Sequence, residues 1–179
     1  MAESTPIVLT DRLSLRAQRA ADIPYLLDLW CDPRVTEFMG GPRERAVLQA
    51  DLEQVARQQS IETFDLWPVE HRGSGRVIGH CGLIKKVVAG ATETELVYVI
   101  AYGDWGKGFA SEIGAGLIDY AFVTLQLPGL IALIDPANFG SERVAQKLGM
   151  RLDREIVRPS GAIRRLYRIA NIQENRDEQ

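Results

Sequence analysis

The feature that most constrains the fold of this chain is a glycine-rich segment at residues 102–112 (YGDWGKGFASE), which joins a predicted strand to a predicted helix. Gly106 and Gly108 carry no side chain, so the backbone there can approach a ligand closely. The first amides of a helix have no partner within the helix, and the helix dipole favours negative charge at that end. Such a terminus binds phosphate, and Lys107 adds a positive charge. The segment therefore predicts an anion-binding loop, with a simple tight turn as the alternative.

Hydrophobic periodicity predicts strands and helices over nearly the whole chain. The predicted strands are residues 10–18, 63–71, 76–86, 93–101, 129–134, 151–157 and 163–169, and the predicted helices are residues 21–31, 44–59, 110–124 and 138–148. Residues 129–134 (GLIALI) are almost wholly apolar, which is typical of a buried central strand. The sequence thus predicts one α/β (α+β) domain over residues 1–170, followed by a frayed polar tail over residues 171–179.

Composition excludes several classes of function. The 179 residues are 46% hydrophobic and 25% charged with a net charge of −3, which argues against generic nucleic-acid or anionic-membrane binding. Cys31 and Cys81 lie far apart and no CxxC or HExxH spacing occurs, so we expect two free thiols and no protein-held metal. Residues 1–9 do not resemble a signal peptide and no run of about 20 apolar residues exists, so we expect a cytoplasmic protein.

A dinucleotide-binding fold is a second interpretation of the glycine-rich segment. That fold expects a third glycine, where this chain has Ser111, and an acidic residue about 20 positions later. The next acidic strand end, Asp135, lies beyond that spacing, and three predicted strands precede the one that leads into the loop. The pattern disfavours a dinucleotide fold.

Four blocks of sequence resemble one family. Residues 105–112 (WGKGFASE) are similar to the coenzyme A pyrophosphate loop of the GNAT acetyltransferase superfamily, most closely its ribosomal-protein alanine N-acetyltransferase-like branch. Residues 138–150 (NFGSERVAQKLGM) resemble the family's N-x-x-S-x-R-V-x-x-K-L-G-F. Residues 95–98 (ELVY) resemble E-I/L-G-Y, and residues 10–16 (TDRLSLR) resemble T-x-R-L-x-L-R. The blocks occur in the family's order over almost the whole chain.

The resemblance implies a GNAT-like fold, with a mixed sheet of about seven strands splayed in the middle and about four flanking helices. It implies acetyl-CoA as the acyl donor, bound between strands 93–101 and 129–134, and no metal. Backbone groups of three strand residues should pair with the pantetheine arm, and the loop should hold the pyrophosphate. The implied coenzyme-binding residues are Tyr98, Val99, Ile100, Trp105, Gly106, Lys107, Gly108, Phe109, Ala110, Ser111 and Asn138.

The reaction that the resemblance implies is transfer of the acetyl group to a primary amine in a ternary complex. The amine must be neutral to attack, so we expect Glu95 to act as the base, directly or through water, with Glu93 as the same-face alternative. We expect Ser141 to protonate the departing thiolate. Glu95 as a solvent-exposed carboxylate, Ser141 as an ordinary first-turn serine and Asn138 as an N-cap are the simpler alternatives. His80 is expected to be structural.

The chain departs from the family at several positions. Ala145 stands where many members carry a tyrosine acid, Trp105 where many carry Arg or Gln, and Val97 where the strand motif has glycine. We expect Trp105 to seal the loop against the sheet. The loss at Ala145 makes a non-catalytic acetyl-CoA sensor or interaction module the alternative function. The acceptor stays open between a ribosomal-protein or other peptide N-terminus, a polyamine and another small amine, in a monomer or homodimer without nucleic-acid or membrane partners.

Overall fold

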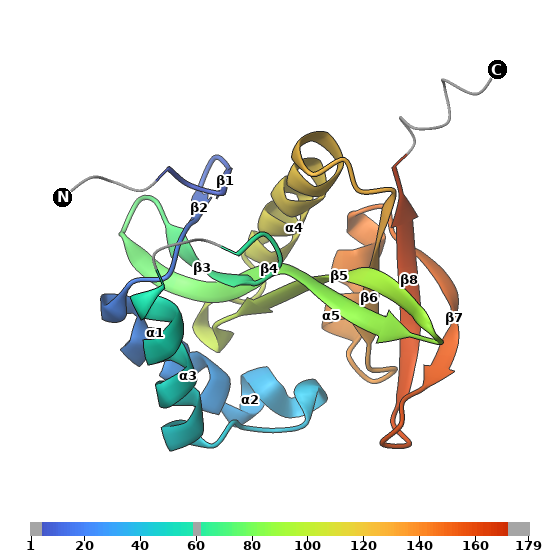
Figure 1. Cartoon of the computed structure of the whole chain (residues 1–179), viewed down its shortest axis with the longest axis horizontal. Helices are drawn as coiled ribbons and strands as arrows, with labels where there is room; N and C mark the ends of the chain where they lie inside the picture. The colour runs from blue at the N-terminus through green and yellow to red at the C-terminus, as the bar shows by residue number, and fades with distance from the viewer. Residues whose placement is uncertain (1–4, 59–61, 172–179) are drawn as a thin grey trace.

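The protein is built around an eight-stranded sheet with the strand order β1-β2-β3-β4-β5-β6-β8-β7 (Figure 1). The computed structural model describes residues 5–58 and 62–171. The strands are β1 (Val8–Leu9), β2 (Leu13–Leu15), β3 (Leu66–His71), β4 (Arg76–Val88), β5 (Ala91–Ile100), β6 (Gly129–Ile134), β7 (Arg151–Val157) and β8 (Ile163–Ala170). Neighbouring strands run antiparallel except β5 and β6, which run parallel.

Helices cover both faces of this sheet (Figure 1). They are α1 (Ile23–Cys31), α2 (Pro33–Thr36), α3 (Arg45–Arg57), α4 (Phe109–Asp119) and α5 (Phe139–Lys147). The face that carries α4 and α5 holds the larger hydrophobic core, and α1 and α3 enclose a smaller one on the opposite face. One face of the sheet is thus covered by α4 and α5, and the other is bordered by α1 to α3.

Strand β5 supplies side chains to both cores. Leu96 and Ile100 pack in the core beneath α4, whereas Val97 and Val99 pack against α1. This alternation follows from the two-residue period of a strand, in which successive side chains point to opposite faces. Glu95 therefore lies on the same face as Val97, toward α1 to α3.

The predicted fold class is confirmed, with three differences in detail. The sheet has eight strands because residues N-terminal to the predicted strand 10–18 form β1. That predicted strand shrinks to β2 because Thr10 closes a turn on Leu13, whose amide donates to the Thr10 hydroxyl at 3.0 Å. A short helix, α2, begins at Pro33 because the Asp32 side chain caps it by accepting from the amide of Arg34 at 2.9 Å.

The predicted tail over residues 171–179 lies outside the described residues except for Asn171. Across the two described ranges, no helix has the length and apolar character needed to cross a membrane. Cys31 and Cys81 are free thiols, as the sequence predicts.

The sheet splits between β5 and β6, which are both described in full. They pair at a single position, Glu95 with Ile131, after which β5 runs on to Ile100 and β6 to Ile134 without further pairing. On its other edge β5 pairs continuously with β4 from Ala91 to Ile100, so Val97 causes no bulge. The predicted splay in the middle of the sheet is thus present and begins at Glu95.

Candidate functional site

The opening between β5 and β6 exposes backbone groups of alternate residues. In an antiparallel ladder, successive residues turn their amides and carbonyls to opposite neighbours. The amide of Ala101 donates to the carbonyl of Ile78 on β4 at 2.8 Å, and this contact fixes the alternation along β5. The backbone groups of Tyr98 and Ile100 consequently face the opening, whereas those of Val99 face β4. Of the three residues expected to pair with pantetheine, two are oriented to do so.

Trp105 closes the far end of the opening. Its indole Nε1 donates to the carbonyl of Ile100 at 2.7 Å, and its ring lies 5.0 Å from that of Tyr102. The side chain is half exposed, at 49%, so it links the loop to the strand end without being buried. This is the sealing role expected for Trp105, and it occupies one of the two Ile100 backbone groups.

The predicted anion-binding loop leads directly into α4. Gly106 and Gly108 have φ angles of 74° and 81°, in the left-handed region where glycine is favoured. Gly108 is the N-cap and has no side chain with which to cap the helix. The amides of Phe109, Ala110 and Ser111 form the first turn, where a helix can receive an anion.

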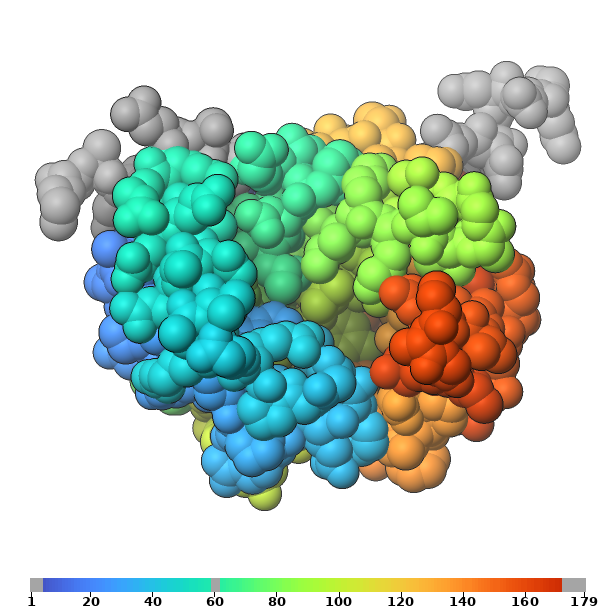
Figure 2. All heavy atoms as spheres, turned by 60° about the horizontal axis from the view of Figure 1, so that its bottom comes forward, coloured from blue at the N-terminus to red at the C-terminus, as the bar shows by residue number. Residues whose placement is uncertain are grey.

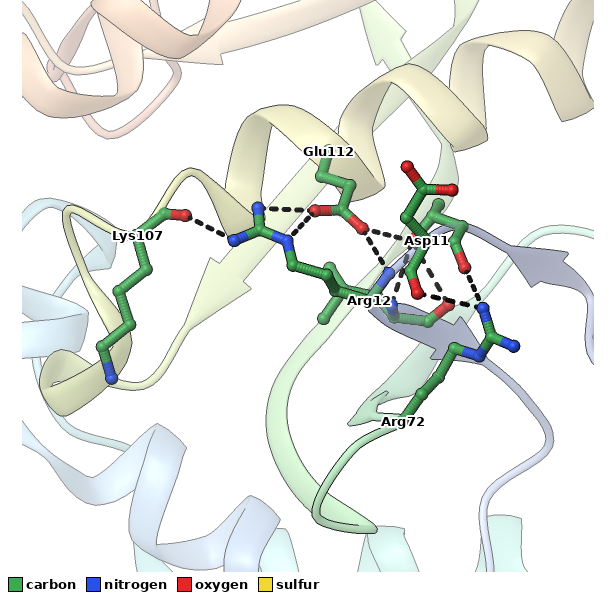
Figure 3. A network of polar contacts seen from close by, with 7 residues as sticks. Asp11, Arg12, Arg72, Lys107 and Glu112 are labelled. Atoms are coloured by element: carbon green, nitrogen blue, oxygen red, sulfur yellow. Dashed lines mark hydrogen bonds and ion pairs between the residues drawn. The ribbon is translucent and has the colours of Figure 1, made fainter.

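An ion pair between Arg12 and Glu112, here called the clamp, holds this loop on the side of the turn before β2 (Figure 3). Arg12 donates to the Lys107 carbonyl at 3.1 Å and pairs with Glu112 at 2.6 Å. Its guanidinium also lies 4.6 Å from the centre of the Phe109 ring. Because a trans peptide is planar, a Lys107 carbonyl aimed at Arg12 turns the Gly108 amide to the opposite side. The clamp thus orients a loop amide away from Arg12.

Glu112 anchors the clamp from the first turn of α4. It accepts from the Thr10 hydroxyl at 2.6 Å and from the Arg12 amide at 2.9 Å. Burial alone would raise the pKa of Glu112, but these donors and the Arg12 charge outweigh it and hold the pKa below its usual range. The sequence interpretation missed Arg12 as a site residue, although the T-x-R-L motif that contains it was the available signal.

The positive charge of Lys107 is already paired with an acidic side chain. Its ammonium pairs with Asp104 at 2.8 Å, and Asp104 also pairs with Arg76 at 2.9 Å. Burial opposes ionisation of Asp104, yet the Lys107 hydrogen bond and the Arg76 charge leave its pKa below the ordinary value. The ammonium points away from Arg12 and Glu112 in Figure 3. The predicted anion binding by the loop would therefore depend mainly on its amides.

Glu95 lies where the sheet divides. It is 7% exposed, so the alternative of a solvent-exposed strand-end carboxylate is wrong. Its carboxylate forms a hydrogen-bonded ion pair with Lys86 of β4. Glu93, the same-face alternative, pairs instead with Arg168 of β8 at 2.8 Å. Lys86 is the closest charged partner of the expected base, and the sequence interpretation did not find it.

The N-terminus of α5 lies beside the opening. Asn138 caps the helix by accepting from the Ser141 amide at 3.0 Å, so the N-cap role is present. The Tyr98 phenol donates to the Ser141 carbonyl at 2.9 Å and ties the splayed strand to α5. Burial raises the pKa of Tyr98, so the phenol keeps its proton at neutral pH. Ala145 is fully buried and adds no polar group here.

His80 has a structural environment. Trp30 donates its indole N–H to His80 Nδ1 at 3.0 Å, and His80 Nε2 lies 3.1 Å from the Leu66 carbonyl. With Nδ1 accepting, Nε2 must carry the proton. Burial lowers the pKa of His80 to about 4, and the ring is neutral at physiological pH. The expected structural role fits this geometry.

The surface is hollowed next to these residues (Figure 2). The hollow lies between the helices of residues 33–57, the β4–β5 hairpin and the turn that joins β7 to β8. A separate cavity lies under α1 and α2 and is lined among others by Tyr25, Asp32, Arg34, Arg76 and Tyr102. Within the described part of the chain, no group of three or more His, Cys, Asp or Glu side chains could hold a metal ion.

Comparison with known proteins identifies the class. Residues 12–151 match the family model described as "Acetyltransferase (GNAT) domain", so the chain belongs to the GNAT acetyltransferase family. It is 33% identical over 144 residues to the protein described as "Uncharacterized N-acetyltransferase p20" of Bacillus licheniformis, covering 79% of this chain and 80% of the relative.

Solved structures agree in fold. An acetyltransferase from Agrobacterium tumefaciens str. C58 is 28% identical with a TM-score of 0.76, covering 94% of this chain and 96% of that one. Spermidine N-acetyltransferase from Vibrio cholerae, solved with CoA and spermine, is 18% identical with a TM-score of 0.71, covering 89% and 96%. The protein is therefore an acetyltransferase that uses acetyl-CoA as cosubstrate. The narrower ribosomal-protein alanine branch stays a prediction.

Proposed function

We propose that this protein transfers the acetyl group of acetyl-CoA to a single primary amine by direct attack in a ternary complex. The observation that carries the proposal is the position of Glu95, a buried carboxylate at the point where β5 and β6 separate. A base at that point can take a proton from an amine that enters from the hollow, while the thioester lies in the opening.

The coenzyme is proposed to lie along the opening and across the start of α4. Backbone groups of Tyr98 and Ile100 pair with the pantetheine arm in the manner of an added strand. The amides of Gly108 to Ser111 hold the pyrophosphate, and Asn138 faces the coenzyme from α5. Apart from Asn138, these contacts use the backbone, which is how a chain with few basic side chains at the loop can bind a charged coenzyme.

Departure of the thiolate is proposed to involve the first turn of α5. Ser141 is the candidate donor, and the dipole of the α5 N-terminus favours the negative sulfur. A thiolate is already a tolerable leaving group, so a strong acid at Ala145 is not required. For this reason the missing tyrosine does not favour the alternative of a non-catalytic sensor.

The acceptor is proposed to carry one amine, as an N-terminal α-amine or a small monoamine does. Acidic groups near the opening are already paired with cations, Glu93 with Arg168 and Asp135 with Arg164 at 2.8 Å each. A polyamine would add further positive charges beside Lys86 and these arginines, which like-charge repulsion disfavours. A peptide N-terminus or small monoamine avoids that repulsion.

The surroundings of the enzyme are part of the same proposal. We place it in the cytoplasm as a monomer or homodimer without nucleic-acid or membrane partners. The free thiols of Cys31 and Cys81 are consistent with a reducing compartment.

The test is release of coenzyme A thiol in the presence of a panel of acceptors. The panel contains alanine- and serine-initiated peptides, small monoamines and spermidine. We expect turnover with a monoamine or peptide and little with spermidine. Gly108→Asp, which puts a carboxylate where phosphate should lie, is the inactive control. Tight acetyl-CoA binding without acetylation of any acceptor would support the sensor instead.

A further inference from the structure

Lys86 occupies an unusual position among the four lysines of the chain. Its ammonium is hydrogen-bonded to the carboxylate of Glu95, the proposed base. Lys85, the next residue, points to the other face of β4 and donates to the Thr94 hydroxyl at 2.8 Å. Lys107 pairs with Asp104, and Lys147 is exposed on α5. Of the four lysines, Lys86 is the one whose ammonium pairs with Glu95, the carboxylate proposed to deprotonate the acceptor amine.

That position is the one an acceptor amine would take. An amine that Glu95 deprotonates directly must lie within hydrogen-bond reach of its carboxylate. The Lys86 amine already lies there, on the face of the sheet shared with Val97. Its side chain is 33% exposed, so it reaches the carboxylate from a partly open surface and is not locked in a core. A four-carbon side chain with free rotation lets the amine move toward the opening.

We propose that Lys86 is itself an acetyl acceptor, so that the enzyme acetylates its own Lys86 Nζ when acetyl-CoA is bound and no other amine fills the site. This inference rests on the proposed function of Glu95 as the base. The inference makes Lys86 a site of modification, and it makes the Lys86 amine a competitor of the external acceptor for Glu95.

The chemistry balances without any further reactant. The Lys86 ammonium passes a proton to Glu95, and the nitrogen lone pair attacks the thioester carbonyl carbon. The C–N bond forms and the C–S bond breaks, after which the thiolate takes up a proton and leaves as coenzyme A. The nitrogen loses its second proton to solvent, and the product is a neutral amide.

Three properties follow from this proposal. The reaction stops after one acetyl group per chain because the amide is no longer nucleophilic and cannot pair as an ammonium. Its rate rises with pH because only the neutral amine attacks. A saturating external acceptor should protect Lys86, because both amines need the same carboxylate.

The experiment incubates the full chain with acetyl-CoA alone and follows acetylation of each lysine by peptide mass spectrometry. We expect one acetyl group, at Lys86. Lys85→Arg is the matched control and should leave the modification unchanged, because Lys85 lies on the opposite face. Glu95→Gln should slow acetylation of Lys86 by about 10²-fold. Lys86→Arg should abolish it, with folding checked by thermal melting.

Acetyl transfer to the amine panel is measured on the same sample. An unmodified Lys86 in a protein that acetylates an external amine would overturn this inference and leave the proposed function standing. Equal labelling of Lys85, Lys86, Lys107 and Lys147 would show non-enzymatic chemistry and overturn it as well. Absence of both reactions would overturn the proposed function together with the inference.

Discussion

At the residue scale, the pairing of Glu95 with Lys86 determines how Glu95 could act as the proposed base. A carboxylate buried beside apolar Val97 and Ile131 is costly unless it is paired and hydrogen-bonded, and Lys86 meets that need. If Glu95 acts as the proposed base, an external amine must displace the Lys86 ammonium before Glu95 can accept its proton. In that mechanism Lys86 inhibits the site until an acceptor arrives.

Glu95→Gln keeps the size of the side chain but removes the base. We expect kcat to fall by about 10²-fold near neutral pH and to recover partly at high pH, where more of the acceptor amine is already neutral. Steady-state rates over a range of pH measure this. Glu93→Gln is the matched control, because Glu93 pairs with Arg168 on the same face, and it should have a much smaller effect. A wild-type rate for Glu95→Gln at every pH would exclude Glu95 as the base.

His80 predicts how stability depends on pH. Its folded-state pKa of about 4 lies below the usual value near 6.5, so the unfolded chain takes up the proton first. Stability is then fully present above pH 6.5 and is lost as the pH falls toward 4, by about 3 kcal/mol at most. Denaturant unfolding between pH 4 and 7 measures this loss. His80→Gln cannot titrate, and its stability should change less over this interval; an identical slope would exclude His80 as the source.

Sequence alone predicted the residues whose chemistry is local. Gly106 and Gly108 were predicted from their neighbours along the chain, and both adopt the left-handed conformation that only glycine takes easily. Lys86 and Arg12 were missed because each acts through a partner set by strand register or by tertiary packing. Arg12 reaches the carbonyl of a residue 95 positions away. A contact between residues so far apart in the chain cannot be predicted from residue spacing in a single sequence.

At the element scale, the start of α4 is positioned by the turn that precedes β2. Arg12 bonds the Lys107 carbonyl and Glu112, while Arg72 of the β3–β4 turn donates to the carbonyls of Thr10 and Asp11 at 2.6 and 3.0 Å (Figure 3). Two turns and a helix terminus thus share one network. The loop conformation depends on this network as well as on its own glycines.

Arg12→Gln should release the Lys107 carbonyl and let the Gly108 amide turn away from the pyrophosphate. We expect the KM for acetyl-CoA to rise by about tenfold, with little change for S-acetylpantetheine, which lacks the pyrophosphate. Arg72→Gln is the control, since it loosens the same turn without touching the loop. Equal loss with both donors would show that Arg12 only stabilises the fold.

The elements themselves were predicted best where burial is complete. Residues 129–134 match β6 at both ends because an unbroken apolar run of 6 residues has the length of a buried strand and is too short for a typical helix. The helix predicted over residues 110–124 continues from α4 into a π-helical turn over Tyr120–Thr124, which periodicity does not distinguish from α-helix. The prediction of one strand over residues 10–18 was wrong. The alternation of apolar and polar residues continues there, but Thr10 lies in a turn that Glu112 and Arg72 hold by hydrogen bonds.

At the scale of the whole molecule, the sheet consists of two parts joined through one bridge, Glu95 with Ile131. Strands β1 to β5 form one part and β6, β8 and β7 the other. A coenzyme seated in the opening would connect the two parts along the length where they do not pair with each other.

Amide hydrogen exchange tests this arrangement. The Tyr98 amide faces the opening and should exchange quickly in the unliganded protein and become protected when acetyl-CoA binds, because an added partner then occupies it. The Val99 amide faces β4 and is the internal control, protected in both states. Exchange is read residue by residue by NMR. Unchanged exchange at Tyr98 with coenzyme bound would exclude pairing of the pantetheine arm at this strand.

The opening also determines which mutations the site can tolerate. Because the groups that face it are main-chain amides and carbonyls, any residue that keeps the strand extended supplies them equally well. Val97, where the resembling strand motif has glycine, shows that a larger side chain is accommodated, because the β4 ladder stays regular there. With the coenzyme paired to the backbone as proposed, selection on its binding would act weakly on side-chain identity along the end of β5. The strand can change its sequence to suit new acceptors on the α1 face while it retains the same acyl donor.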